Sequence, residues 1–233
     1  MAAMAVRGQL LERAVVIPRD GECIDGIFLR GDLGALLIAA PLPWEGGSMA
    51  SPLSNELAYA AARSGCASLR MDYLGVGGSE GERPETLAGA ALDLVEGVSF
   101  LSESAEVARV AVAGCLSGAW AALQLAAQDR RVDRLLLVAP DLASRPLGTP
   151  SLREVDLPIV LVAAADEPDF NLSDFVEFVD AAPKARLEVV STRRNFRSEL
   201  IRLARLVPPF LGVPDLERDE ERGGEGRRRG KLF

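Results

Sequence analysis

A short stretch in the middle of the chain has the composition of a catalytic turn. Residues 112–119 read Val-Ala-Gly-Cys-Leu-Ser-Gly-Ala and lie between an apolar run and a helical pattern. Such a strand-to-helix turn can hold a nucleophilic serine as Gly-x-Ser-x-Gly, because the residues two before and two after its tip must be small. Gly114 and Gly118 have this spacing, but Leu116 lies midway between them. When residues 114–118 are aligned with Gly-x-Ser-x-Gly without a gap, both glycines match and leucine takes the position of the serine. Leucine has no atom that can attack a substrate, so this alignment keeps the turn but has no nucleophile.

The composition also restricts the available bases and metal ligands. The 233 residues include no histidine, so there is no imidazole base and no imidazole metal ligand. The arginines stay protonated, and Lys184 and Lys231 are the only lysines. Cys23, Cys66 and Cys115 have the spacing of neither a disulfide framework nor a metal site. We therefore expect no metal, no cofactor and a reducing, cytoplasmic location.

Charge and hydropathy exclude two classes of partner. The formal net charge of −8 argues against a nucleic-acid partner, because phosphate binding needs a concentrated basic face. The basic cluster at 227–229 follows acidic residues. No apolar run approaches the length of a membrane span, and residues 1–11 lack the apolar core of a signal peptide. The sequence therefore predicts neither a nucleic-acid partner nor a membrane span.

Apolar runs alternate with helical patterns along most of the chain, which predicts an α/β domain at 13–213. Strands are expected at 13–17, 23–29, 35–40, 66–73, 107–113, 134–139, 158–164 and 186–190, and helices at 52–64, 86–101, 117–128, 172–181 and 196–207. The first two strands would form an antiparallel hairpin, and the others a mostly parallel sheet with helices on both faces. Residues 1–12 form an N-terminal segment, and residues 214–233 a disordered charged tail.

Three loops follow strands at the edge where α/β sheets bind ligands. The first, at 40–49, reads Ala-Pro-Leu-Pro-Trp-Glu-Gly-Gly-Ser-Met. The second, at 69–81, contains Gly75, Gly77, Ser79 and Gly81, and the third is the turn at 112–119. Together they resemble the α/β-hydrolase superfamily, in particular the small serine-aminopeptidase-like hydrolases whose first motif reads His-Pro-His-Pro-x-x-Gly-Gly-Ser-Met. The connection between the strands at 134–139 and 158–164 is short, which predicts a minimal cap or none.

The resemblance implies a Ser-His-Asp triad, but two of its three positions are changed. Leu116 occupies the position of the serine. Asn195 occupies that of the histidine, in a segment similar to Asp-His-Phe-Phe, and asparagine cannot cycle a proton near neutral pH. Asp166 remains at the position of the acid, after the strand at 158–164. The triad is therefore expected to be vestigial, with no catalytic residue in it.

Other residues near the turn remain candidates. Ser117, one residue late, is either a displaced nucleophile that uses Asp166 or Glu167 directly as its base, or a cap of the following helix. Cys115 precedes the tip and is expected to be buried and unreactive. In the resembling family the first loop supplies a backbone N–H to the oxyanion hole, so Leu42 and Trp44 are expected to line the pocket with Ser117. Trp44 either stacks on a ligand or covers the strand ends.

These observations lead to three functional hypotheses. The first is a catalytically inactive α/β-hydrolase homologue that binds a small ligand or a protein partner. The second is a serine hydrolase that acts on an ester, thioester or amide through Ser117 without histidine. The third is a structural or assembly subunit. The sequence does not determine the oligomeric state.

Overall fold

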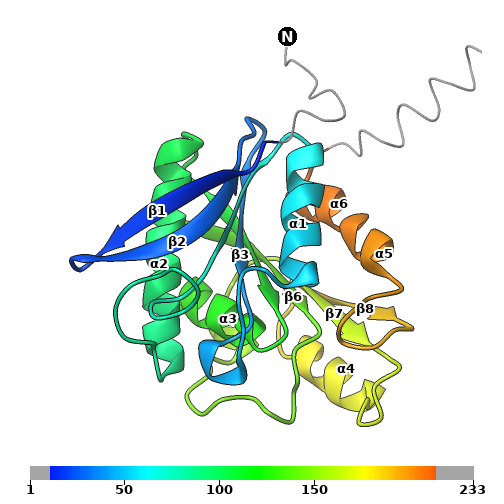
Figure 1. Ribbon diagram of the computed structural model, residues 1–233. Helices are drawn as coiled ribbons and strands as arrows, with labels where there is room; N and C mark the ends of the chain where they lie inside the picture. Colours follow the sequence, from blue (N-terminus) through cyan, green and yellow to red (C-terminus); the bar gives the residue numbers. More distant parts are fainter. Residues whose placement is uncertain (1–10, 214–233) are drawn as a thin grey trace, which may run out of the picture.

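The computed structural model describes residues 11–213, and the predicted tail at 214–233 lies outside the described residues. Eight strands form one sheet in the order β1-β2-β4-β3-β5-β6-β7-β8 (Figure 1). β2 pairs antiparallel with β1 and with β4, and every other pair in the sheet is parallel. The predicted mostly parallel sheet with an N-terminal antiparallel hairpin is confirmed.

The elements alternate along the chain as expected. The strands are β1 (Arg13–Arg19), β2 (Glu22–Leu29), β3 (Ala35–Ala39), β4 (Ala67–Met71), β5 (Val110–Cys115), β6 (Val132–Val138), β7 (Ile159–Ala164) and β8 (Ala185–Val190). The α-helices are α1 (Pro52–Arg63), α2 (Leu87–Ser104), α3 (Gly118–Gln128), α4 (Leu172–Asp180), α5 (Leu200–Ala204) and α6 (Val207–Leu211). Two short 3₁₀ helices, η1 (Pro43–Glu45) and η2 (Leu152–Glu154), lie in loops.

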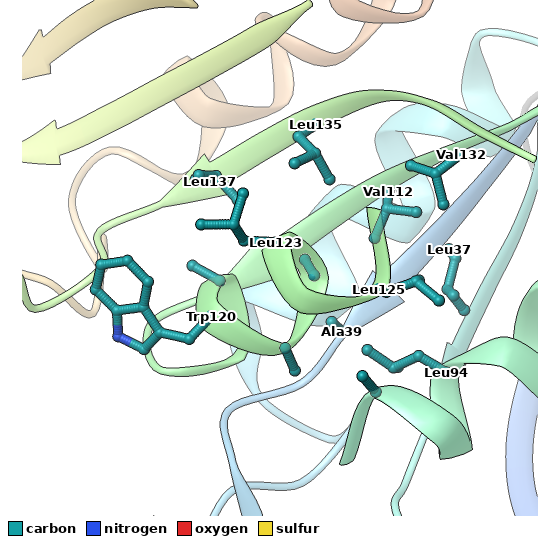
Figure 2. Packing of buried hydrophobic residues seen from close by; sticks show 14 of the residues in the cluster. Leu37, Ala39, Leu94, Val112, Trp120, Leu123, Leu125, Val132, Leu135 and Leu137 are labelled. Carbon is teal, nitrogen blue, oxygen red and sulfur yellow. The ribbon is translucent and has the colours of Figure 1, made fainter. Parts of the chain in front are cut away.

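Helices cover both faces of the sheet, which explains why β3, β4, β5 and β7 are buried along their whole length. α2, α3 and α4 contribute to the apolar cluster on one face, and α1, α5 and α6 to the cluster on the other. Figure 2 shows the first cluster, in which Trp120 and Leu123 of α3 lie near Leu137 of β6. Trp120 is therefore part of the core, as its place in the elbow helix predicts.

The C-terminal part of the domain differs from the prediction. The single helix expected at 196–207 is wrong, because Phe196 is buried with a φ of +52° and α5 begins only at Leu200. A proline pair directly after residue 207 is typical of the end of a helix, but Pro208 lies in the first turn of α6. A proline is tolerated there because the first helical N–H groups have no partner within the helix. The proline pair therefore lies in a separate short helix and does not simply end the one before it.

The connection between β6 and β7 contains only η2, which agrees with the predicted absence of a large cap. No helix within residues 11–213 has the length and apolar character needed to span a membrane.

Candidate functional site

The turn between β5 and α3 has the shape of a nucleophile elbow. Leu116 forms its tip with a φ of +52°, and its N–H donates to the Val138 carbonyl at 2.8 Å. A Cβ on Gly114 would lie 2.5 Å from Ala119 Cα, and one on Gly118 would overlap the Ala40 carbonyl oxygen. Both glycines are therefore required by the close approach of other backbone.

Leu116 is itself an unusual residue for this conformation. The left-handed region costs a residue other than glycine about 1 kcal/mol, because Cβ approaches the backbone. The Leu116 side chain is half-buried and packs against the apolar cluster that α1 covers. The tip of the elbow therefore carries an apolar side chain that contacts the core.

Ser117 lies next to the tip, and its hydroxyl group is buried. Ser117 is 6% exposed, and its Oγ accepts a hydrogen bond from the Leu42 N–H at 2.9 Å. The hypothesis that Ser117 caps α3 is wrong, because its side chain makes no cap hydrogen bond and is used by Leu42. Within residues 11–213, no carboxylate is hydrogen-bonded to this hydroxyl. In the described residues, no carboxylate is therefore placed by a hydrogen bond to act as a base for Ser117.

The first loop is held close to the end of β3. The Tyr73 hydroxyl donates to the Ala40 carbonyl at 2.9 Å, and the Leu42 side chain is fully buried in the core. Trp44 lies in η1 and is 41% exposed. Neither Leu42 nor Trp44 lines the cavity around Arg194 or the two depressions beside α4. Leu42 therefore contributes its N–H, and not its side chain, to this region.

Asp72 joins the second loop to the first. It is 3% exposed, and its Oδ1 accepts from the Met49 N–H at 2.7 Å. Burial raises the pKa of Asp72, and the Met49 N–H partly offsets this effect. A Cβ on Gly77 would overlap Oδ2 of the same carboxylate. Asp72 was not predicted as a site residue, and its role here is to hold the two loops together.

The two remaining triad positions lie at the surface. Asp166 is exposed, and its Oδ1 accepts from the Ser191 hydroxyl at 2.8 Å. Asn195 is also exposed, and its Oδ1 accepts from the Arg197 N–H at 3.2 Å. No hydrogen bond joins Asp166, Asn195 and Ser117 to one another in the described part of the chain. The structure therefore does not connect these positions as a triad.

Arg194, which the sequence analysis did not predict, organises this side of the edge. Its guanidinium lies 3.1 Å from an Asp141 oxygen and 2.8 Å from an Asp169 oxygen, and its N–H donates to Glu167 at 2.7 Å. Burial raises the pKa of Asp141, but the Ser144 hydroxyl and the charge of Arg194 outweigh it, so that the pKa is lowered. The arginine therefore acts as an internal counter-ion for several acids. In the sequence, the only signal that Arg194 belongs to this site is its position next to Asn195.

The site offers little space or reactivity. Arg194 and the surrounding acids line a cavity of about 50 Å³, whereas pockets for drug-sized ligands typically measure roughly 300–1,000 Å³. The predicted burial of Cys115 is confirmed, and burial raises the pKa of its thiol to about 12. Within residues 11–213, no group of acidic or cysteine side chains has the arrangement of a metal site.

Comparisons with known proteins give structural relatives only. No protein-family model matches the chain, and no curated protein matches it significantly in sequence. An α/β serine hydrolase homologue from Coxiella burnetii has a TM-score of 0.75 at 22% identity, over 84% of this chain and 95% of the other. For an α/β serine hydrolase without lid from Xanthomonas campestris, the TM-score is 0.75 at 19% identity, with 87% and 95% covered. A Pyrococcus furiosus esterase has a TM-score of 0.73 at 16% identity, with 87% and 91% covered. The chain therefore has the α/β-hydrolase fold that its loop motifs predicted.

Proposed function

We propose that this protein is a catalytically inactive α/β-hydrolase homologue that functions by binding. The observation that carries the proposal is the hydrogen bond between Ser117 Oγ and the Leu42 N–H. In hydrolases of this fold, a backbone N–H from the loop after β3 stabilises the oxyanion of the reaction. Here the corresponding N–H, that of Leu42, already donates to the Ser117 hydroxyl of the protein itself. The one serine next to the elbow tip is thereby also turned away from any substrate.

The lack of a base supports the same proposal. The chain contains no histidine, and Asn195 cannot accept and return a proton near neutral pH. Asp166 is hydrogen-bonded to Ser191, and the Arg194 guanidinium stays protonated. A hydrolase that acted through Ser117 would have to break the bond with Leu42 and then activate the hydroxyl without a neighbouring base.

The shape of the surface favours a macromolecular partner over an enclosed small molecule. The cavity beside Arg194 measures about 50 Å³. The larger depressions lie along α4 and are open to solvent, with about 710 Å³ in the one that Leu172 and Val176 line. An open groove excludes little water from a small ligand, whereas a protein surface can cover it.

The experiment is to treat the purified chain with a serine-directed fluorophosphonate and, separately, with an activated acetate ester. We expect no covalent adduct by intact mass and no hydrolysis above that in buffer. An active serine hydrolase of the same fold, treated in parallel, shows that the reagents work. An adduct that maps to Ser117 and is lost in Ser117→Ala would overturn the proposal.

A second variant separates the loss of the nucleophile from the loss of the base. Leu116→Ser returns a hydroxyl to the tip of the elbow, where φ is +52°. Because neither a base nor a free Leu42 N–H accompanies it, we expect this variant to stay unreactive towards the ester. Turnover at a rate close to that of the parallel hydrolase would show that the rest of the catalytic machinery is intact.

A further inference from the structure

The two edges of the sheet differ in how well they are protected from pairing with another strand. β1 forms one edge and β8 the other (Figure 1). β1 contains Pro18, which cannot donate a ladder hydrogen bond and therefore blunts an edge. β8 reads Ala-Arg-Leu-Glu-Val-Val and contains neither proline nor lysine. Of the two edges, β8 is therefore the one that is open to a further strand.

The register with β7 determines which backbone groups of β8 face outward. The Lys184 carbonyl accepts from the Ile159 N–H at 3.2 Å, and the Val190 carbonyl accepts from the Ala165 N–H at 2.8 Å. In a parallel ladder, alternate residues direct their N–H and C=O groups to the same neighbour. The even-numbered residues of β8 therefore bond to β7. The backbone groups of residues 185, 187 and 189 point away from β7, and of these the Ala185 N–H already donates to the Ala182 carbonyl at 3.1 Å.

The side chains of β8 alternate between charged and apolar. Arg186 and Glu188 share one face, with Nη1 and Oε1 3.8 Å apart, and they are 53% and 39% exposed. Such an exposed pair contributes little to the stability of a fold. Leu187 faces the opposite side and packs against the cluster that α4 covers. Val189, on the same side, is 40% exposed.

We propose that β8 pairs antiparallel with β8 of a second copy of this chain, about a two-fold axis at Leu187. In this register the outward N–H and C=O groups of Leu187 bond to those of Leu187 in the second copy, and the Ala185 carbonyl accepts from the Val189 N–H of the second copy. Arg186 then lies opposite Glu188 of the second copy, and Glu188 opposite its Arg186. These are non-hydrogen-bonded positions, where opposed side chains come closest.

The order of charges along β8 selects this register over its neighbours. An axis at residue 186 would place Lys184 opposite Glu188 but also Arg186 opposite Arg186, and an axis at residue 188 would place Glu188 opposite Glu188. An axis at residue 185 would place Lys184 opposite Arg186. Directly opposed like charges destabilise a strand pair. An axis at residue 189 would place Glu188 opposite Val190 and leave the charges without partners. Only the axis at Leu187 pairs both charges of both copies.

The test is sedimentation equilibrium of the full chain over a range of concentrations. We expect a reversible dimer. Arg186→Glu and Glu188→Arg should each weaken it at least about tenfold, because each places two like-charged pairs across the axis. The double variant Arg186→Glu/Glu188→Arg should restore the dimer, since opposite charges face each other again. A purely structural role of these residues within one copy does not predict that recovery.

Two further variants serve as controls. Arg13→Glu reverses an exposed charge on β1, at the opposite edge, and should leave the dimer unchanged. Val189→Pro removes an outward N–H without touching the β7 ladder and should abolish the dimer, with thermal unfolding reporting on the fold. Three outcomes would overturn the proposal: a wild-type monomer up to the solubility limit, a dimer insensitive to the single reversals, or a double variant as weak as the single ones. The proposal does not depend on whether the protein is a catalyst.

Discussion

The two halves of the sheet's carboxyl edge are held together by different kinds of contact. In the β3–β5 half, which comprises the loops at 40–51, 72–86 and 116–117, the contacts are hydrogen bonds made by buried side chains. Leu42 donates to Ser117, Met49 to Asp72, and the Tyr73 hydroxyl to Ala40. In the β6–β8 half, with loops at 139–158, 165–171 and 191–199, the contacts are ion pairs of Arg194 that are partly open to solvent.

This difference shows which loop positions the fold itself requires. A buried donor or acceptor that loses its partner costs about 1–3 kcal/mol, whereas an exposed ion pair contributes about 0–1 kcal/mol. The elbow and the first loop belong to the core, so changing their backbone geometry would destabilise the domain. Asp166 and Asn195 are exposed. Their residue types can therefore change at little cost to stability, whereas those of the elbow cannot.

The largest expected effect tests the elbow. Gly118→Ala places a Cβ on the Ala40 carbonyl oxygen, so we expect a loss of more than about 3 kcal/mol in the free energy of unfolding. The matched control is Gly148→Ala in the other half, where φ is +78° and no atom lies within 4 Å of the added Cβ. That variant should lose only about 1 kcal/mol, from backbone strain alone. Equal losses in urea unfolding would contradict the contrast between the halves.

The next effect tests the buried hydroxyl. Ser117→Ala leaves the Leu42 N–H without its acceptor in a buried position, so the free energy of unfolding should fall by about 1–3 kcal/mol. Ser191→Ala removes an exposed hydroxyl that donates to Asp166 and should change it by less than about 0.5 kcal/mol. Both values come from urea unfolding at pH 7. If Ser191→Ala lowered the free energy of unfolding as much as Ser117→Ala, burial of the hydroxyl would not explain the loss in Ser117→Ala.

A third prediction concerns the charge at Asp72. Asp72→Asn keeps a carbonyl oxygen for the Met49 N–H and removes a buried charge, so it should be neutral or slightly stabilising, whereas Asp72→Ala should lose about 1–3 kcal/mol. Because the folded pKa of Asp72 is raised, the folded state binds this proton more tightly than the unfolded state does. The wild type should therefore gain stability relative to Asp72→Asn as the pH falls through that raised pKa. A stability difference independent of pH would show that the carboxyl titrates normally.

The sequence predicted the features that depend on local pattern. Continuous apolar runs identified the buried strands, and glycine spacing identified the elbow, because each reflects the geometry of a few neighbouring residues. The hydrogen bond between Ser117 and Leu42 joins residues 75 positions apart, so helix-cap preferences alone gave the wrong role for the hydroxyl. The Phe196 turn was also missed. Its left-handed backbone follows Asn195, whose Oδ1 accepts from the Arg197 N–H, and the prediction used Asn195 only as a triad position.

Arg194 was not predicted because ion pairs between loops produce no characteristic residue spacing in the sequence. Its substitution is expected to have the smallest effect on stability. The side chain is 32% exposed, so solvent screens its pairs with Asp141 and Asp169. Arg194→Gln should lower the free energy of unfolding by less than about 1 kcal/mol at pH 7 and low salt, and by less still at high salt. Arg193→Gln, at an exposed neighbouring position, is the control for adding an amide to this loop.

The pH dependence of Arg194→Gln provides the sharper test. Since the folded pKa of Asp141 is lowered, its stabilisation is complete above the ordinary carboxyl range and is lost as the pH falls through the lowered value. The difference between the wild type and Arg194→Gln should therefore shrink below about pH 4, once Asp141 takes up its proton. A loss as large as that of Ser117→Ala, unchanged by salt and by pH, would mean that the β6–β8 half is held as firmly as the elbow.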